Sequence, residues 1–165
     1  MAGGIEIEIS GITGFNAGLD AILAAVETAT RTALTLNAQT LAKTAVLGFN
    51  GQHAKGTPRS AGGNRPQNVT TNLSRSIHPL TSTPTPLGGG SWTIRVAPTL
   101  IYGRRIELGF TGTDSIGRHY NQPAYPYLRP AIGRATPAMQ GIYEYYWGAA
   151  LKVWWENIRS DIEMV

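Results

Sequence analysis

The chain contains no cysteine and only three histidines among its 165 residues. The lack of cysteine excludes a disulfide framework, a thiolate nucleophile and a zinc site built on thiolates. No run of 18 apolar residues is present that could span a membrane, and the acidic start MAGGIEIEISG lacks the basic-then-apolar order of a secretion signal. We therefore expect a soluble protein that is made in the cytoplasm and has no membrane partner.

Charged residues are also scarce, at 15% of the chain against 42% hydrophobic residues. Such a low share of charged residues indicates that partner molecules cover part of the surface. Residues 1–42 hold one base against four acids (net −3), residues 43–134 hold eleven against two (net +9), and residues 135–165 hold two against four (net −2). The basic centre suits a polyanion or an acidic protein surface as its partner.

Two long amphipathic helices are predicted, after an alternating strand at residues 4–10. No proline occurs from Asn16, a candidate N-cap, to Gly48, a candidate residue after the helix end. Apolar residues between them recur at helical spacing, which predicts a helix of about 30 residues. Thr136 as an N-cap followed by Pro137 predicts a last helix that runs to about residue 162.

Strands and loops are predicted between the two helices. Residues 49–71 are rich in Gly, Asn and Pro and predict a mobile basic loop. Strands are expected at residues 73–80, 91–97 and 100–110, followed by a polar loop at 111–122. We therefore expect a single α+β domain, residues 1–165, in which an antiparallel sheet of about four strands packs against a long N-terminal helix and a C-terminal helix.

The C-terminal helix carries aromatic rings on more than one side. Tyr143, Trp147 and Trp154 fall within about 40° of one another on a helical wheel, whereas Trp155 and Tyr145 lie about 120° and 200° from Tyr143. Tyr and Trp outside the core face are typical of subunit interfaces, so we infer that a neighbouring chain covers Tyr145 and Trp155. The alternative is that the two rings lie flat on their own domain.

The loop at residues 111–122 gathers an acid, a serine and a histidine, as an active site would. However, Asp114, Ser115 and His119 lie on one short segment, whereas triad members come from separate elements, and no G-x-S-x-G elbow is present. The three histidines lack the spacing of a metal site, and the glycine runs lack the Lys-Ser/Thr that follows in a phosphate loop. The sequence therefore predicts no enzyme, no cofactor and no metal.

Basic residues of the central region are candidates to contact DNA or an acidic partner, namely Lys55, Arg59, Arg65, Arg104 and Arg105. They are spread along the chain without a recognition helix, an RNP strand or a zinc finger, so base-specific recognition is not expected. Contact with the DNA backbone and contact with an acidic protein both stay open.

The order of four motifs resembles one known family. Ala54-Lys55 precedes Thr57-Pro58, TTNLSRSI follows at residues 70–77, YGRRIELGF at 102–110, and PAYPYLRPA at 123–131 before the last helix. The neck, or tail-completion, proteins of long-tailed bacteriophages are similar. They carry an Ala-Lys pair before a small residue and proline, then Thr-Gly-x-Leu-Arg-x-Ser-Ile, Tyr-Ala-x-x-Val-Glu-Phe-Gly and Pro-Phe-Leu-Arg-Pro-Ala.

The resemblance covers about residues 17–150, with some departures. Thr71 stands where the family has glycine, Ser74 where it has arginine, Gly103 where it has alanine and Tyr127 where it has phenylalanine. Residues 59–69 resemble an insertion.

This resemblance implies a virion structural protein at the head–tail junction, which assembles as a ring, commonly of six copies. The ring would join the portal-connector assembly to the tail tube, and double-stranded DNA would pass through it. The implied partners are further copies of the chain, a head-closure or connector protein, and a tail terminator or tube protein. The chain would be made in the host cytoplasm. Two rival interpretations are a tail terminator that caps the tail tube and a non-specific DNA-binding protein.

Within this interpretation residues 111–122 form a docking loop. Glu107 and Arg129 are expected to pair as a latch that holds the two ends of the loop together. The prolines that follow the loop reduce the entropy lost on docking. The expected partner interface comprises side chains of this region and of the last helix: Phe110, His119, Tyr120, Tyr125, Tyr127, Tyr145 and Trp155.

Overall fold

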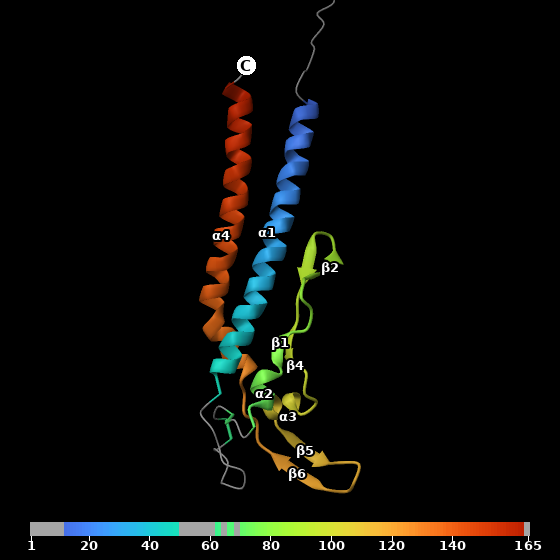
Figure 1. Cartoon of the computed structure of the whole chain (residues 1–165). Coiled ribbons are helices and arrows are strands. Elements are labelled where there is room, and N and C mark those ends of the chain that lie inside the picture. The colour runs from blue at the N-terminus through green and yellow to red at the C-terminus, as the bar shows by residue number, and fades with distance from the viewer. Residues whose placement is uncertain (1–11, 50–61, 64–65, 68–69, 164–165) are drawn as a thin grey trace, which may run out of the picture.

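Two long antiparallel helices form the length of the molecule. The computed structural model describes residues 12–49, 62–63, 66–67 and 70–163, and side chains from residue 16 to residue 156. Helix α1 (Ile12–Leu47) and helix α4 (Leu128–Glu163) have 36 residues each, which corresponds to roughly 54 Å. They pack side by side, so that the start of α1 and the end of α4 lie at the same end of the molecule (Figure 1). The expected strand at residues 4–10 and most of the expected basic loop lie outside the described residues.

The buried face of α1 is made of small side chains, which allow neighbouring elements to approach the helix closely. Its buried alanines are Ala29, Ala33, Ala38, Ala42 and Ala45. Alanine also has the highest intrinsic helix propensity, so the same residues favour the helix and its packing. Against them lie α4, which contributes Ala131 and Ala135, and two short strands, β1 (Ile77–Pro79) and β4 (Val96–Pro98).

The strands pair in three separate two-stranded antiparallel sheets within the described residues. β1 pairs with β4, β2 (Thr85–Gly88) with β3 (Ser91–Thr93), and β5 (Phe110–Thr113) with β6 (His119–Gln122). The predicted strand at 91–97 is therefore divided between two sheets. The α+β class, with antiparallel strands and two long helices packed together, is confirmed, but the expectation of one sheet of about four strands is wrong.

Two predicted strands are partly or wholly helical. Residues 73–80 start in the short helix α2 (Asn72–Arg75) before β1, and residues 100–110 contain helix α3 (Gly103–Leu108). The hydroxyl of Tyr127 donates to the carbonyl of Gly103, and a Cβ at Gly103 would meet the Pro98 ring. Long-range packing onto Tyr127 and Pro98 thus favours a helix where the sequence predicted a strand.

Helix α4 begins nine residues earlier than Pro137, the first helical residue that the sequence predicts. It starts at Leu128, and Pro137 lies inside it. Thr136 does not cap the helix, because its hydroxyl donates to the Ile132 carbonyl of the preceding turn. Pro130 stands in the first turn, where backbone N–H groups have no partner within the helix, so its missing N–H costs nothing there.

The core lies where the end of α1 meets the start of α4. Its buried cluster consists of Ala42, Ala45, Leu73, Ile77, Tyr127 and Ala131. Tyr127 is the largest of these and is 1% exposed. Its ring packs at 5.3 Å from the ring of Phe49. The cluster joins α1, α2, β1 and α4, and therefore fixes the small elements to the base of the helix pair.

Thr71 adopts a backbone conformation that favours glycine. Its φ is 57°, and a β-branched residue is strained in this left-handed region. We expect Thr71→Gly to raise the free energy of unfolding by about 1 kcal/mol, because the relief of strain exceeds the entropy cost of glycine. Urea denaturation measures the change. Thr99→Gly is the control and should lower stability, since Thr99 is exposed and its φ is not positive; equal effects of the two variants would contradict this account.

Candidate assembly surface

Glu107 holds the first turn of α4 through the backbone. Its Oε2 accepts from the N–H groups of Tyr127 (2.7 Å) and Leu128 (2.9 Å), and its Oε1 accepts from the N–H of Arg129 (2.9 Å). These are groups that a helix N-terminus leaves without partners, and the negative charge is also favourable at the positive end of the helix dipole. Glu107 is therefore a helix cap supplied by α3, 20 residues away in sequence.

The expected ion pair between the side chains of Glu107 and Arg129 is wrong. Glu107 and Arg129 do lie together, but the contact is to the backbone of Arg129, and no ion pair with its guanidinium is present in the described part of the chain. Both ends of the segment 108–126 are nevertheless held by this cap. The N–H of Tyr125 also donates to the carbonyl of Ile106, at 2.7 Å.

Tyr125 and Tyr127 face their own chain instead of a partner. They are 7% and 1% exposed, so the expectation that they contact another chain is wrong. The segment that carries them is pinned by Glu107, which turns the Tyr127 ring toward Phe49 and its hydroxyl toward Gly103. Burial, and to a smaller extent the negative charge of Glu107, raises the pKa of the Tyr127 hydroxyl well above its ordinary value. The Tyr127 hydroxyl is therefore neutral in the folded protein.

The expected docking loop is a β-hairpin with an ordered tip. β5 and β6 pair over four residues each, and Asp114 organises the turn between them. Its Oδ1 accepts from the backbone N–H groups of Ile116 and Arg118, and its Oδ2 accepts from the Arg118 guanidinium and the Tyr120 hydroxyl. The Arg118 backbone N–H is the main cause that holds the pKa of the Asp114 carboxyl below its usual value. Asp114 is thus a turn-forming residue, engaged by its own hairpin.

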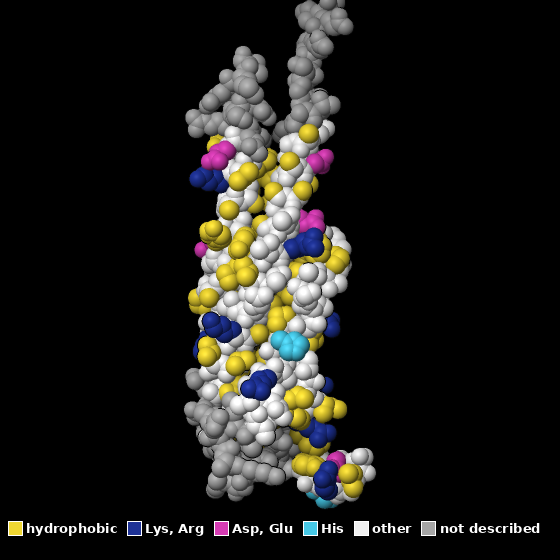
Figure 2. All heavy atoms as spheres, viewed as in Figure 1, with side chains coloured by type: hydrophobic (Ala, Val, Ile, Leu, Met, Phe, Trp, Pro, Cys, Tyr) yellow, Lys and Arg dark blue, Asp and Glu magenta, His cyan; other side chains and the backbone are white. Residues whose placement is uncertain are grey.

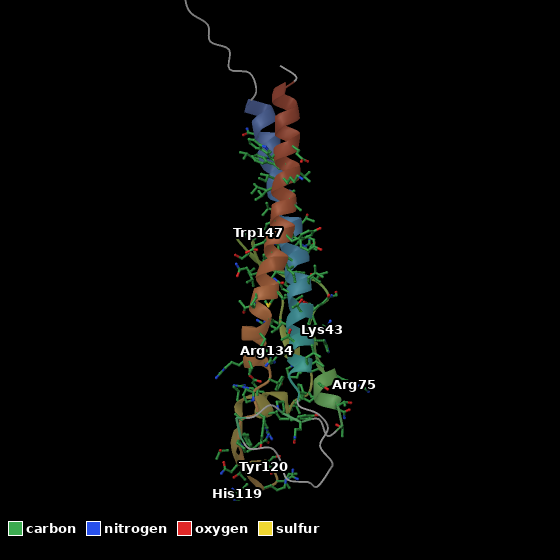
Figure 3. All side chains as sticks on the ribbon, turned by 90° about the vertical axis from the view of Figure 1, so that its left-hand side faces the viewer. Lys43, Arg75, His119, Tyr120, Arg134 and Trp147 are labelled. Atoms are coloured by element: carbon green, nitrogen blue, oxygen red, sulfur yellow. The ribbon has the colours of Figure 1, made fainter. Side chains whose placement is uncertain are left out.

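The remaining interface candidates of this region lie on the hairpin at one end of the molecule. Phe110 and Tyr120 are half-buried against each other, with ring centroids 5.9 Å apart, and the Arg105 guanidinium lies 4.2 Å from the Phe110 ring centroid. His119 is exposed and hydrogen-bonded to Thr113 across the strands, at 2.8 Å. Figure 3 shows Tyr120 and His119 far from Trp147, toward the end opposite the helix tips.

The upper part of the helix pair, which we call the arm, has no buried core. The arm comprises residues 16–28 of α1 and residues 144–156 of α4, and none of its side chains is fully buried. Two hydrogen bonds link the helices at its ends, from the indole N–H of Trp147 to the Thr30 hydroxyl and from that of Trp154 to the Gly18 carbonyl. Two helices alone cannot enclose an apolar core, so the arm is stabilised only along one seam.

Large apolar side chains of the arm are exposed to solvent. They are Leu19, Leu23, Tyr145, Trp147, Leu151, Val153 and Trp155, and Figure 2 shows apolar side chains over the upper part of both helices. Tyr145 is 71% exposed and Trp155 60%, which confirms that both lie off the core face and excludes the alternative that they lie flat on their own domain. Exposed apolar patches of this kind mark interaction sites.

The charges of the described side chains separate along the molecule. The arm holds four acids, Asp20, Glu27, Glu144 and Glu156, against Lys152, a net charge of −3. The remaining described side chains, which we call the body, hold nine Arg and Lys against Glu107 and Asp114, a net charge of +7. Both acids of the body are engaged in the contacts described above. The fold therefore places the two acidic ends of the sequence side by side, away from the basic centre.

The candidate basic contacts are only partly described. Arg104 and Arg105 are exposed on α3, whereas Lys55, Arg59 and Arg65 lie outside the described residues. Two exposed apolar residues beside the arginines were not predicted from the sequence, namely Ile101 (95% exposed) and Leu108 (54% exposed). The signal that could have found them is the helical spacing of residues 101, 104, 105 and 108, which the expected strand at 100–110 obscured.

A hollow lies between α1 and the segment that leads into β2. It has a volume of about 220 Å³ and is lined by Thr28, Arg31, Thr32, Thr35, Thr83 and Pro84. Three of its hydroxyls donate to carbonyls of α1 itself, and Arg31 stacks on Trp92. Within the same described ranges, no three His, Asp or Glu side chains come close enough together to hold a metal ion. None of the described helices is long and apolar enough to span a lipid bilayer.

No protein-family model, curated protein sequence or solved structure matches the chain.

Proposed function

We propose that the protein is a structural component of a phage virion that forms a ring at the head–tail junction, joins the portal-connector assembly to the tail tube and lets DNA pass. The observation that carries the proposal is the arm, whose exposed Tyr145, Leu151, Val153 and Trp155 have no core of their own to enter. Side chains of this kind gain free energy when another chain covers them, at roughly 25 cal/mol per Å² of apolar surface.

Two structural details support the resemblance to neck proteins. The strained φ of Thr71 falls at the position where that family carries glycine, which is the residue this backbone favours. The two most specific motifs, YGRRIELGF and PAYPYLRPA, also meet in space, because Glu107 of the first caps the helix that the second begins. The two motifs occur together because the first motif caps the helix that starts in the second.

The test is the assembly phenotype of particles that lack the chain. We expect full heads and separate tails when its gene is deleted, with joining restored by the intact gene, and an affinity-tagged chain located at the junction of restored particles by electron microscopy. Overlong tail tubes would instead indicate the tail terminator, because a tube without its cap continues to polymerise. Normal joined particles in the deletion strain would refute a role in assembly.

The basic body favours one alternative, non-specific binding to DNA. Its net charge of +7 is carried by arginines and lysines that meet few acids. A DNA-binding protein would shift duplex DNA of any sequence, with an affinity that falls steeply as salt rises. Heads and tails that join normally without the chain, together with such a shift, would favour this alternative.

A further inference from the structure

One exposed face of α4 combines apolar and acidic side chains. Glu144, Leu151 and Trp155 stand at positions i, i+7 and i+11, within about 40° of one another around the helix. Tyr145 and Glu156 lie farther round the helix on one side of them, about 100° and 120° from Glu144. All five are exposed, Leu151 to 46% and Trp155 to 60%. We call these five residues the outer face of α4. It offers aromatic area with an acidic side chain, Glu144, at one end, and at the other end Glu156 is paired with the exposed Lys152 at 3.8 Å.

The α3 segment of the body presents the complementary combination. Within α3, Arg104 and Arg105 stand four and three residues before Leu108, so these three lie on one side of the helix, and Ile101 lies in the turn that precedes it. All four are exposed, Ile101 to 95% and Leu108 to 54%. Two arginines thus lie between two apolar side chains. Arginine is also enriched at protein interfaces, where its planar group stacks on aromatic rings and pairs with carboxylates.

We propose that the outer face of α4 in one copy of the chain binds the α3 segment of the next copy, a head-to-tail contact that repeats around a ring. This inference rests on the proposed function, and it names the surfaces through which copies meet. Apolar side chains would cover Trp155 and Leu151, while Glu144 and Glu156 would approach Arg104 and Arg105. A second copy is the occupant favoured by charge, because an acidic arm meets a basic body.

Pairing between identical surfaces is disfavoured by the same charges. Two arms side by side would bring a net −3 against −3, and two bodies +7 against +7. Like charges placed together across an interface cost free energy and suppress that arrangement. A contact between two different surfaces leaves one arm unpaired at one end of a row of copies and one α3 segment unpaired at the other end. The row of copies therefore either closes into a ring or grows into a filament.

Cysteine cross-linking tests the contact directly, because the natural chain has no cysteine. A variant with both Tyr102→Cys and Lys152→Cys, exposed residues beside the apolar side chains of the contact, is oxidised and separated on a denaturing gel. We expect a ladder of dimers, trimers and larger species, since each copy then links to two neighbours. α3 and the end of α4 lie at opposite ends of one chain, so the two thiols cannot join within it (Figure 1). Each single variant should stay monomeric.

The cross-linking outcomes separate this contact from the proposed function. Dimers from Lys152→Cys alone would show that arms pair with each other and would overturn the contact. Rings seen by electron microscopy without a ladder in the double variant would also overturn it and leave the proposed function standing. Two results together would overturn both proposals: the double variant stays monomeric up to its solubility limit, and deletion of the gene leaves heads joined to tails.

Charge reversal tests whether the contact is specific to α3. Arg104→Glu with Arg105→Glu should abolish the ladder, and adding Glu144→Arg with Glu156→Arg should restore it. Lys43→Glu with Arg75→Glu is the matched control, because it changes the net charge of the body equally at exposed residues of α1 and α2 (Figure 3). If the control pair of substitutions abolished the ladder to the same extent as the α3 pair, the contact would not be specific to α3 and the proposal would be overturned. Loss of the double-cysteine ladder on addition of short duplex DNA would show that α3 binds DNA instead.

Discussion

Replacing Glu107 with alanine is expected to lower the free energy of unfolding by about 2–3 kcal/mol. The carboxylate accepts three backbone N–H groups at the start of α4, and alanine leaves all three without this partner. Hydrogen bonds to a charged acceptor are stronger than neutral ones, and this charge also lies at the positive end of the helix dipole. Glu107→Gln keeps an acceptor but loses the charge, so about half of the loss is expected, as measured by urea denaturation.

Arg129→Ala is the informative control for the Glu107 variants. Its guanidinium makes no ion pair with Glu107, and its backbone N–H survives the substitution. We expect a change below about 0.5 kcal/mol, as for other exposed side chains. Equal losses in Glu107→Ala and Arg129→Ala would mean that the side chains pair in solution, and the helix-cap interpretation would then be wrong.

Tyr127→Ala is expected to lower the free energy of unfolding by about 3–5 kcal/mol, more than the loss of the Glu107 cap. The side chain fills the centre of the core at 1% exposure, packs on Phe49 and donates to the Gly103 carbonyl. Alanine would leave a cavity beside Leu73 and Ile77, which belong to the same cluster. Thermal or urea unfolding followed by circular dichroism measures the loss.

Two matched variants divide the contributions of Tyr127. Tyr127→Phe removes only the hydroxyl and should cost about 1 kcal/mol, the usual net value of a neutral hydrogen bond. Tyr145→Ala makes the same chemical change as Tyr127→Ala at a residue that is 71% exposed, and should cost less than about 0.5 kcal/mol in the free chain. A large loss in Tyr145→Ala would place that ring in the core and remove it from the proposed interface.

Periodicity predicted the features that repeat along a single element. The long helices, the strand residues within 91–97 and the position of Tyr145 and Trp155 off the core face all follow from the spacing of apolar residues. The prediction failed for residues 103–108, which were expected to belong to a strand and form helix α3. Contacts with Tyr127 and Pro98, distant in sequence, decide the helical conformation there.

The sequence indicated that Glu107 is important but not what it binds. The sequence suggested that the side chains of Glu107 and Arg129 pair, whereas the Glu107 carboxylate accepts from backbone N–H groups. Every residue except proline has such a group, so no sequence pattern reveals this contact. The start of α4 was missed for the same reason, because its cap comes from a different element. Likewise, Tyr125 and Tyr127 resemble interface residues until the fold shows that the Glu107 contact turns the segment inward.

The central claim is that assembly covers the arm. Hydroxyl-radical footprinting read by mass spectrometry measures the solvent access of Tyr145 and Trp155 in the free chain and in joined particles. The account predicts strong oxidation of both rings in the free chain, as their exposure of 71% and 60% requires, and near-background oxidation in the particle. Equal oxidation in both states would contradict it, because no partner would then cover these rings.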